Sequence, residues 1–133
     1  MKLSRLNHVA VAVRDIDKHL EIFSGKLGLK HSEIIEVPAQ GVKVAFVEFE
    51  NSKIELIAPL NEQANLNKFL EKKGEGLHHI AVSVDNVNEA ISELQGKEIQ
   101  SIDKQGRPGA EGHPVAFLHP KSTGGVLIEL EEE

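Results

Sequence analysis

The chain has 133 residues and a formal net charge of −6, with 40% hydrophobic and 27% charged residues. This balance is typical of a folded globular protein, and the length matches one ordinary domain. The acidic charge and the lack of a basic stripe argue against a nucleic-acid partner. The absence of cysteine excludes disulfides and thiolate chemistry.

The N-terminal segment, which begins MKLSR, carries no apolar core of a signal peptide. No apolar run approaches the roughly 18 residues that a membrane-spanning helix needs. We therefore expect a cytoplasmic protein that has no membrane partner.

In the first half of the chain, the pattern predicts a strand, a helix and three further strands. Residues 6–13 (LNHVAVAV) are rich in β-branched side chains, which favours a strand. Residues 15–28 have apolar side chains at helical spacing, with Asp15 or Asp17 available as the N-cap. Three strands are then expected at about 32–37, 42–49 and 53–58.

After a helical segment at 62–73, the second half predicts the same order of elements. Residues 77–84 (LHHIAVSV) indicate a strand, and 86–96 a helix capped by Asn86 or Asn88. Three more strands are expected at about 98–103, 114–119 and 125–131.

The two halves also match residue by residue, which identifies an internal repeat. His79 follows His8 by 71 residues, and VAF at 115–117 follows VAF at 44–46 by the same spacing. IEL at 128–130 follows IEL at 54–56 by 74 residues. Matches in the same order are hard to attribute to chance.

The predicted fold class is therefore α+β, with two tandem βαβββ modules forming a concave mixed sheet around a metal site. We expect a single domain, 1–133, made of repeats at about 4–59 and 75–131. A helical linker at 60–74 joins them.

The repeat also pairs four potential metal ligands, namely His8, Glu55, His79 and Glu129. Strand alternation places each histidine on a face with small neighbours, and each glutamate between two apolar residues that point the other way. A single strand histidine or glutamate is more often a packed or solvated side chain, but the paired placement favours ligands. Two imidazoles and two carboxylates suit an octahedral divalent ion such as Co²⁺, Mn²⁺, Ni²⁺, Fe²⁺ or Zn²⁺.

The chain resembles the vicinal oxygen chelate superfamily, which includes glyoxalases, bleomycin resistance proteins and dioxygenases. The segments that carry the resemblance are LNHVAVAV, KIELIAP, GEGLHHIAVSVDN and VAFLHPKSTGGVLIELE. It implies a glyoxalase-like fold, a homodimer, and metal binding at the same four positions, with Co²⁺ the first expectation.

Within the superfamily, the resemblance is to the branch that interconverts the (2R) and (2S) epimers of methylmalonyl-CoA. It implies an isomerase that takes a CoA thioester and removes its C2 proton through an enolate. Glu129 is one candidate for the base. Some relatives carry a glutamate where this chain has Val44, so Glu48, on the same face of that strand, is a second candidate.

Three residues are candidates for binding the substrate. Lys121 and Ser122 lie in the polar stretch HPKSTGG, and Arg107 lies in the glycine-rich segment 104–114. These cationic and hydroxyl side chains could contact the substrate carboxylate or the CoA phosphates. The alternative is that the first stretch is only a hairpin turn.

Other functions compete on the same fold. A glyoxalase I-type lactoylglutathione lyase uses a similar ligand set, and a metal-free binding or resistance protein would need none. An extradiol dioxygenase would leave the fourth carboxylate unexplained.

Overall fold

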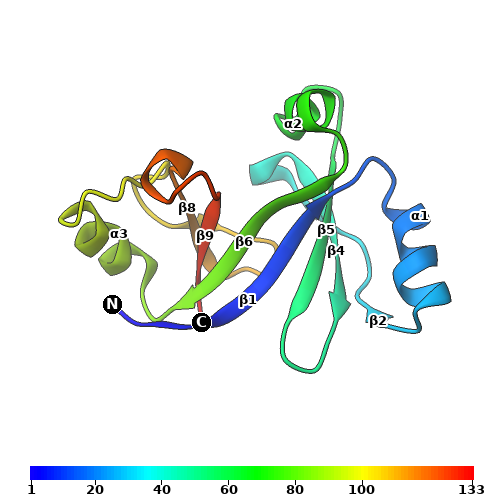
Figure 1. Ribbon diagram of the computed structural model, residues 1–133, viewed down its shortest axis with the longest axis horizontal. Coiled ribbons are helices and arrows are strands. Elements are labelled where there is room, and N and C mark those ends of the chain that lie inside the picture. Colours follow the sequence, from blue (N-terminus) through cyan, green and yellow to red (C-terminus); the bar gives the residue numbers. More distant parts are fainter. The chain divides into compact units, whose positions relative to one another are not determined.

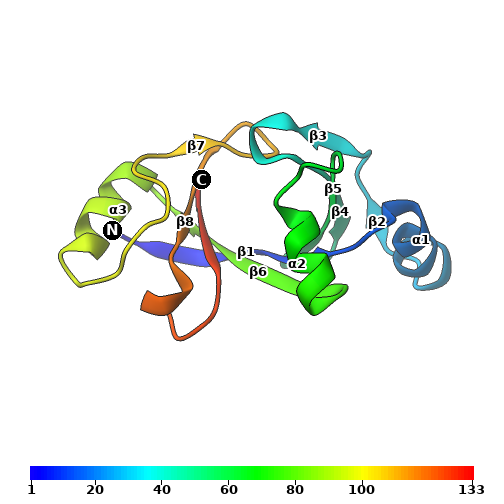
Figure 2. The same cartoon turned by 90° about the horizontal axis from the view of Figure 1, so that it is seen from above.

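The computed structural model describes residues 1–133 and divides into two compact units. One unit is His8–His78, and the other combines Met1–Asn7 with His79–Glu133. Each unit is a small sheet with a helix packed on one face, as Figures 1 and 2 show. No helix is long and apolar enough to cross a bilayer.

The sheet of the His8–His78 unit is built around two long antiparallel strands. The second part of β1 (Leu3–Ala12) runs parallel to β5 (Lys53–Pro59), and β4 (Val42–Glu48) pairs antiparallel with β5. Two short strands, β2 (Lys30–His31) and β3 (Ile35–Val37), both pair with β4. The strands predicted at 42–49 and 53–58 are therefore confirmed. Of the strand expected at 32–37 only Ile35–Val37 forms, and β2 lies just before that range.

One face of this sheet is covered by the helical segment that follows β1. Residues Ile16–Leu20 form α1, and Glu21–Lys26 continue as a π-helix. The side chain of Asp15 caps α1 by accepting a hydrogen bond from the backbone N–H of Lys18, as predicted. Buried Val13, Ile16, Ala45, Val47, Leu56 and Ala58 form the core on this face.

The second sheet repeats this arrangement. Strand β6 (Gly76–Val84) runs parallel to β9 (Ile128–Glu132), and β8 (Pro114–Leu118) pairs antiparallel with β9. A two-residue strand, β7 (Arg107–Pro108), extends the sheet beyond β8. Helix α3 (Val87–Gln95) packs its apolar residues on β8 and β9, where the core includes Val84, Ala116, Leu118 and Leu130.

Asn86 caps α3 by accepting from the backbone N–H of Glu89, which confirms that prediction. The linker helix is also present, as α2, although it spans only Leu66–Lys73. It begins late because Asn61 holds the preceding residues in a turn, accepting from the backbone N–H groups of Gln63 and Ala64.

The strand predicted at 98–103 forms only as a single bridge. Ser101 pairs antiparallel with Leu118, the Ile102 N–H donates to the Phe117 carbonyl, and the His119 N–H donates to the Gln100 carbonyl. Glu98 has a φ of 64°, a left-handed conformation that interrupts an extended chain. The Asp103 carboxylate accepts a hydrogen bond from the backbone N–H of Phe117. In a regular strand pair, a backbone carbonyl would accept it instead.

Candidate functional site

A histidine–glutamate pair lies on the sheet of the His8–His78 unit. Glu55 on β5 is opposite Ala10 on β1, so it shares a face with His8. His8 and Glu55 are 2% and 7% exposed, and the His8 Nε2 atom lies 3.6 Å from Glu55 Oε1. That separation is longer than a hydrogen bond.

Phe46 packs against the His8 ring. It lies on β4 directly opposite Glu55, and its ring meets that of His8 edge to face, with centroids 5.9 Å apart and planes at 70°. Such a contact favours one orientation of the imidazole. The ammonium group of Lys53 lies 4.5 Å from the centroid of the Phe46 ring, within the range of a cation–π contact.

The second unit carries the same arrangement. Glu129 on β9 is opposite Ala81 on β6, and the His79 Nε2 atom lies 3.7 Å from Glu129 Oε1. Both side chains are buried. Phe117 lies opposite Glu129 and meets the His79 ring edge to face, with centroids 5.1 Å apart and planes at 88°. The guanidinium of Arg107 lies 5.6 Å from the centroid of the Phe117 ring.

These two pairs have the chemistry of metal ligands. The nitrogen–oxygen separations of 3.6 and 3.7 Å are short enough for both atoms of each pair to reach one ion at about 2.0–2.2 Å. His8, His79 and Glu129 are buried residues of the kinds that hold metal ions. Ala10 and Ala81, the small residues predicted to share a face with the two histidines, are fully buried.

The other candidate base, Glu48, occupies a different environment. It ends β4 with an exposed side chain and is opposite Lys30 and Lys53 in the strand register. Val44, where some relatives carry a glutamate, is 2% exposed in the same strand. The position at which some relatives carry a glutamate is therefore a buried apolar residue in this chain.

The candidate substrate residues lie at two places in the second unit. Arg107 forms an ion pair with Asp103, with Nε 3.1 Å from Oδ1, and stacks on the ring that touches His79. Lys121 and Ser122 lie in the short 3₁₀ helix Pro120–Ser122, where the Ser122 hydroxyl accepts from the backbone N–H of Gln100.

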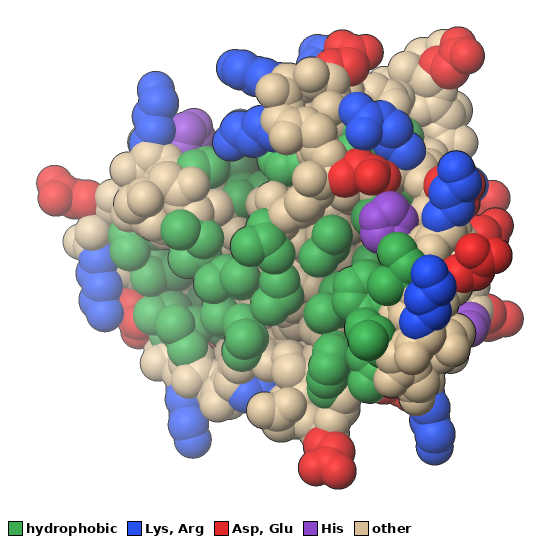
Figure 3. Space-filling view, turned by 45° about the vertical axis from the view of Figure 1, so that its right-hand side comes forward, with side chains coloured by type: hydrophobic (Ala, Val, Ile, Leu, Met, Phe, Trp, Pro, Cys, Tyr) green, Lys and Arg blue, Asp and Glu red, His purple; other side chains and the backbone are tan.

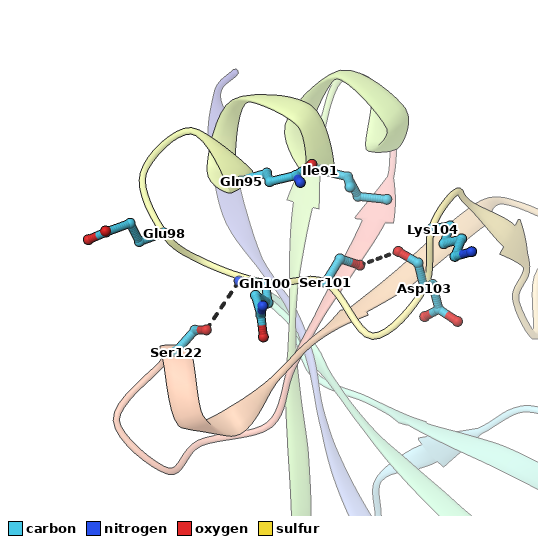
Figure 4. A pocket seen from close by; sticks show the side chains of 8 residues that line it. All are labelled: Ile91, Gln95, Glu98, Gln100, Ser101, Asp103, Lys104 and Ser122. Atoms are coloured by element: carbon cyan, nitrogen blue, oxygen red, sulfur yellow. Dashed lines mark hydrogen bonds between the residues drawn. The ribbon is translucent and has the colours of Figure 1, made fainter.

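Ser122 lines a cavity of about 800 Å³ beside α3, drawn in Figure 4. Ile91 and Gln95 of α3 form one wall, and Ser101 and Lys104 belong to the segment opposite. Glu129 points away from the sheet face that α3 covers, because its neighbour Leu130 packs in the core beneath α3. The cavity is therefore separate from the His79–Glu129 pair.

A charged cluster joins β1 to the chain's last residue. The Arg5 guanidinium donates to the Glu133 carboxylate at 2.7 and 3.0 Å, and Ser83 and Asn7 donate to the same group. The hydrogen bonds from Arg5 and Ser83 lower the pKa of Glu133 to about 2. The hydrogen bond to Glu133 also raises the pKa of Arg5.

The two phenylalanines that contact the histidine rings were not predicted from the sequence. Their signal was present, because Phe46 and Phe117 end the two VAF triplets that established the repeat. An apolar strand residue is ordinarily read as core. Only the register, which sets each ring opposite a ligand-type glutamate, reveals the second role.

Comparison with known proteins extends these observations to nearly the whole chain. Residues 7–117 match the profile of the Glyoxalase/Bleomycin resistance protein/Dioxygenase superfamily. The mitochondrial methylmalonyl-CoA epimerase of Homo sapiens is 47% identical over 98% of this chain and 74% of that protein. The ethylmalonyl-CoA/methylmalonyl-CoA epimerase of Cereibacter sphaeroides is 39% identical over 98% of both chains.

Solved structures give the same picture. A Streptomyces coelicolor methylmalonyl-CoA epimerase variant in complex with 2-nitronate-propionyl-CoA superposes with a TM-score of 0.94. It is 30% identical, and the superposition covers 99% of this chain and 96% of that one. The lactoylglutathione lyase of Escherichia coli O157:H7 is more distant, at 26% identity over 97% of this chain and 93% of that protein.

Proposed function

Because the chain belongs to the glyoxalase/bleomycin resistance protein/dioxygenase superfamily and has its glyoxalase-like fold, we propose that it is a methylmalonyl-CoA epimerase. The observation that carries the proposal is 47% identity to an epimerase over 98% of the chain. The lyase relative, at 26%, is much less similar. The enzyme is an isomerase that interconverts the (2R) and (2S) epimers of a CoA thioester.

The enzyme uses one divalent metal ion, with His8, Glu55, His79 and Glu129 as its ligands. The support is that each repeat buries one imidazole and one carboxylate with Nε2 and Oε1 within 4 Å. A divalent ion held by this set supplies a Lewis acid for the substrate's oxygen atoms. Co²⁺ is our first choice, and Mn²⁺, Ni²⁺, Fe²⁺ and Zn²⁺ suit the same donors.

The protein's own residues move the proton. The C2–H bond breaks, the proton passes to a carboxylate, and the electron pair delocalises into an enolate before a proton returns on the opposite face. Glu129 is the candidate base because it is a buried carboxylate in the ligand pair. Glu48 is the alternative, although its exposure and its position opposite two lysines suit a solvated strand residue better.

Substrate binding draws on the three cationic and hydroxyl candidates. Arg107 is best placed for the anionic part of the substrate, because it stacks on the ring that touches His79. Lys121 is exposed and Ser122 lines the separate cavity beside α3, so contacts with the distant CoA phosphates suit them better.

The protein acts in the cytoplasm as a homodimer. The support for self-association is an exposed apolar surface, which Figure 3 shows gathered over part of one face and bordered by charged side chains. Separately from that view, Leu3 and Leu6 at the start of β1 are large apolar residues that are exposed to solvent. Surfaces of this kind favour contact with another protein chain.

The test is deuterium uptake at C2 of methylmalonyl-CoA in D₂O, with metal-stripped and Co²⁺-loaded protein. We expect exchange with inversion only in the loaded sample. A loaded protein that leaves methylmalonyl-CoA unchanged but isomerises the hemithioacetal of glutathione would instead be a lyase.

A further inference from the structure

Glu131 is a buried carboxylate outside the proposed ligand set. It lies on β9 two residues beyond Glu129 and is 4% exposed. Side chains two apart on a strand share a face, and the residue between them, Leu130, packs in the core beneath α3. Glu131 therefore points to the same side of the sheet as Glu129.

The first repeat shows that the fold does not require a charge at this position. The IEL match aligns Glu131 with Ile57, which is also buried but apolar. Ile57 lies between Ala12 and Val44 in the register, whereas Glu131 lies between Ser83 and Val115. Burying a carboxylate costs free energy that an isoleucine would avoid, and the charge of Arg5 offsets part of that cost. A buried carboxylate that only one repeat carries, on the face of the ligand pair, is a candidate for a chemical role.

The strand register also places Glu131 near the ligand pair. The Cα atoms of residues two apart on a strand are separated by about 6.7 Å. Glu131 and its partner Ser83 therefore form the next pair on this face after Glu129 and Ala81. A glutamate side chain is long and flexible enough to reach a group bound at the Glu129 position from there. Epimerisation needs one proton-transfer group on each face of C2, and Glu131 is a second carboxylate on the sheet face that carries Glu129.

We propose that Glu131 is a second proton-transfer residue of the epimerase, acting on one face of C2. In one direction its carboxylate takes the C2 proton as the C–H bond breaks and the electron pair passes into the enolate. In the other direction its carboxylic acid returns a proton to the same face, while another group serves the opposite face. This role rests on the proposed epimerase function.

The surroundings of Glu131 hold that end of the strand in place. Ser83, its register partner on β6, is fully buried and donates to Glu133. Asn7 donates to the Ser83 hydroxyl at 3.2 Å, and Arg5 binds Glu133. The charge of Arg5 also acts on Glu131, because Glu131 contributes, after Glu133, to the raised pKa of Arg5.

Two substitutions test the proposal. Glu131→Gln keeps the shape of the side chain, and Glu131→Ile installs the residue that the first repeat carries. Glu132→Gln is the matched control, because Glu132 points to the other side and accepts from the backbone N–H of Val87 at the start of α3. Co²⁺ binding by calorimetry reports on the metal site independently of turnover.

We expect both Glu131 variants to bind Co²⁺ within a few-fold of the wild type and to lose about 10²- to 10⁴-fold in epimerisation. In D₂O, Glu131→Gln should exchange the C2 proton of one epimer without inverting it and leave the other epimer unreacted. Wild-type epimerisation in Glu131→Gln, or equal loss of exchange from both epimers, would overturn the role. Failure of the wild-type enzyme to exchange C2 would instead overturn the proposed function.

Discussion

Replacing Phe117 with leucine tests whether the edge-to-face ring orients His79. Phe117 is almost fully buried, and leucine has three fewer side-chain carbons. At about 0.8 kcal/mol per buried carbon, the lost burial costs about 2 kcal/mol. Loss of the aromatic contact, with centroids 5.1 Å apart, adds about 1 kcal/mol. We therefore expect the free energy of unfolding of the metal-free protein to fall by about 3 kcal/mol.

The same change should weaken metal binding, because groups that orient a ligand typically contribute 10- to 100-fold to affinity. Urea denaturation gives the stability and Co²⁺ calorimetry the affinity, and Phe46→Leu should behave alike. Phe69→Leu is the control, since Phe69 meets His78 edge to face at 4.7 Å and His78 is not a proposed ligand. Unchanged Co²⁺ affinity in Phe117→Leu would refute the orienting role, as would an equal loss in Phe69→Leu.

Three further predictions concern stability. The pKa of Glu133 is about 2 in the folded protein and ordinarily 4.5, so ionised Glu133 stabilises the fold above pH 4.5, and this stabilisation is lost as the pH falls towards 2. In urea titrations, Glu133→Gln should therefore lower the free energy of unfolding at pH 6 but not at pH 2. Gly109→Ala should cost about 1–3 kcal/mol in thermal unfolding, because its Cβ would lie 2.7 Å from Val115 Cγ1. Gly25→Ala, which meets nothing within 4 Å, should not destabilise. Asn86→Ala should cost about 1 kcal/mol by losing the cap of α3, and an unchanged midpoint would contradict that assignment.

Most of the fold could be predicted because each strand and helix pattern occurs twice in the chain, once in each repeat. The strands β1, β4, β5, β6, β8 and β9 and both helix caps follow from apolar alternation and capping residues. The strand predicted at 98–103 is reduced to one bridge because side chains accept two of the backbone hydrogen bonds around it. Ser122 accepts from the Gln100 N–H, and Asp103 accepts from the Phe117 N–H. The π-helix at Glu21–Lys26 was also beyond reach, since its apolar spacing equals that of an α-helix.

The sequence could predict the part of the candidate site that depends on strand alternation and on the repeat. They place each histidine and glutamate on a shared face, which the parallel pairings of β1 with β5 and β6 with β9 confirm within each unit. Glu131 was overlooked because it belongs to the acidic ending ELEEE, which is typical of a solvated run. Its burial depends on tertiary structure that no local pattern expresses.

The central claim, that the two repeats serve one catalytic metal, is tested most directly by the stoichiometry of Co²⁺ binding. Calorimetry of the metal-stripped protein should give one ion per chain, and His8→Ala and His79→Ala should each weaken that single site strongly. Two ions per chain would contradict the claim, as would a variant in which one histidine is lost and tight binding remains. In that case each histidine–glutamate pair would act alone.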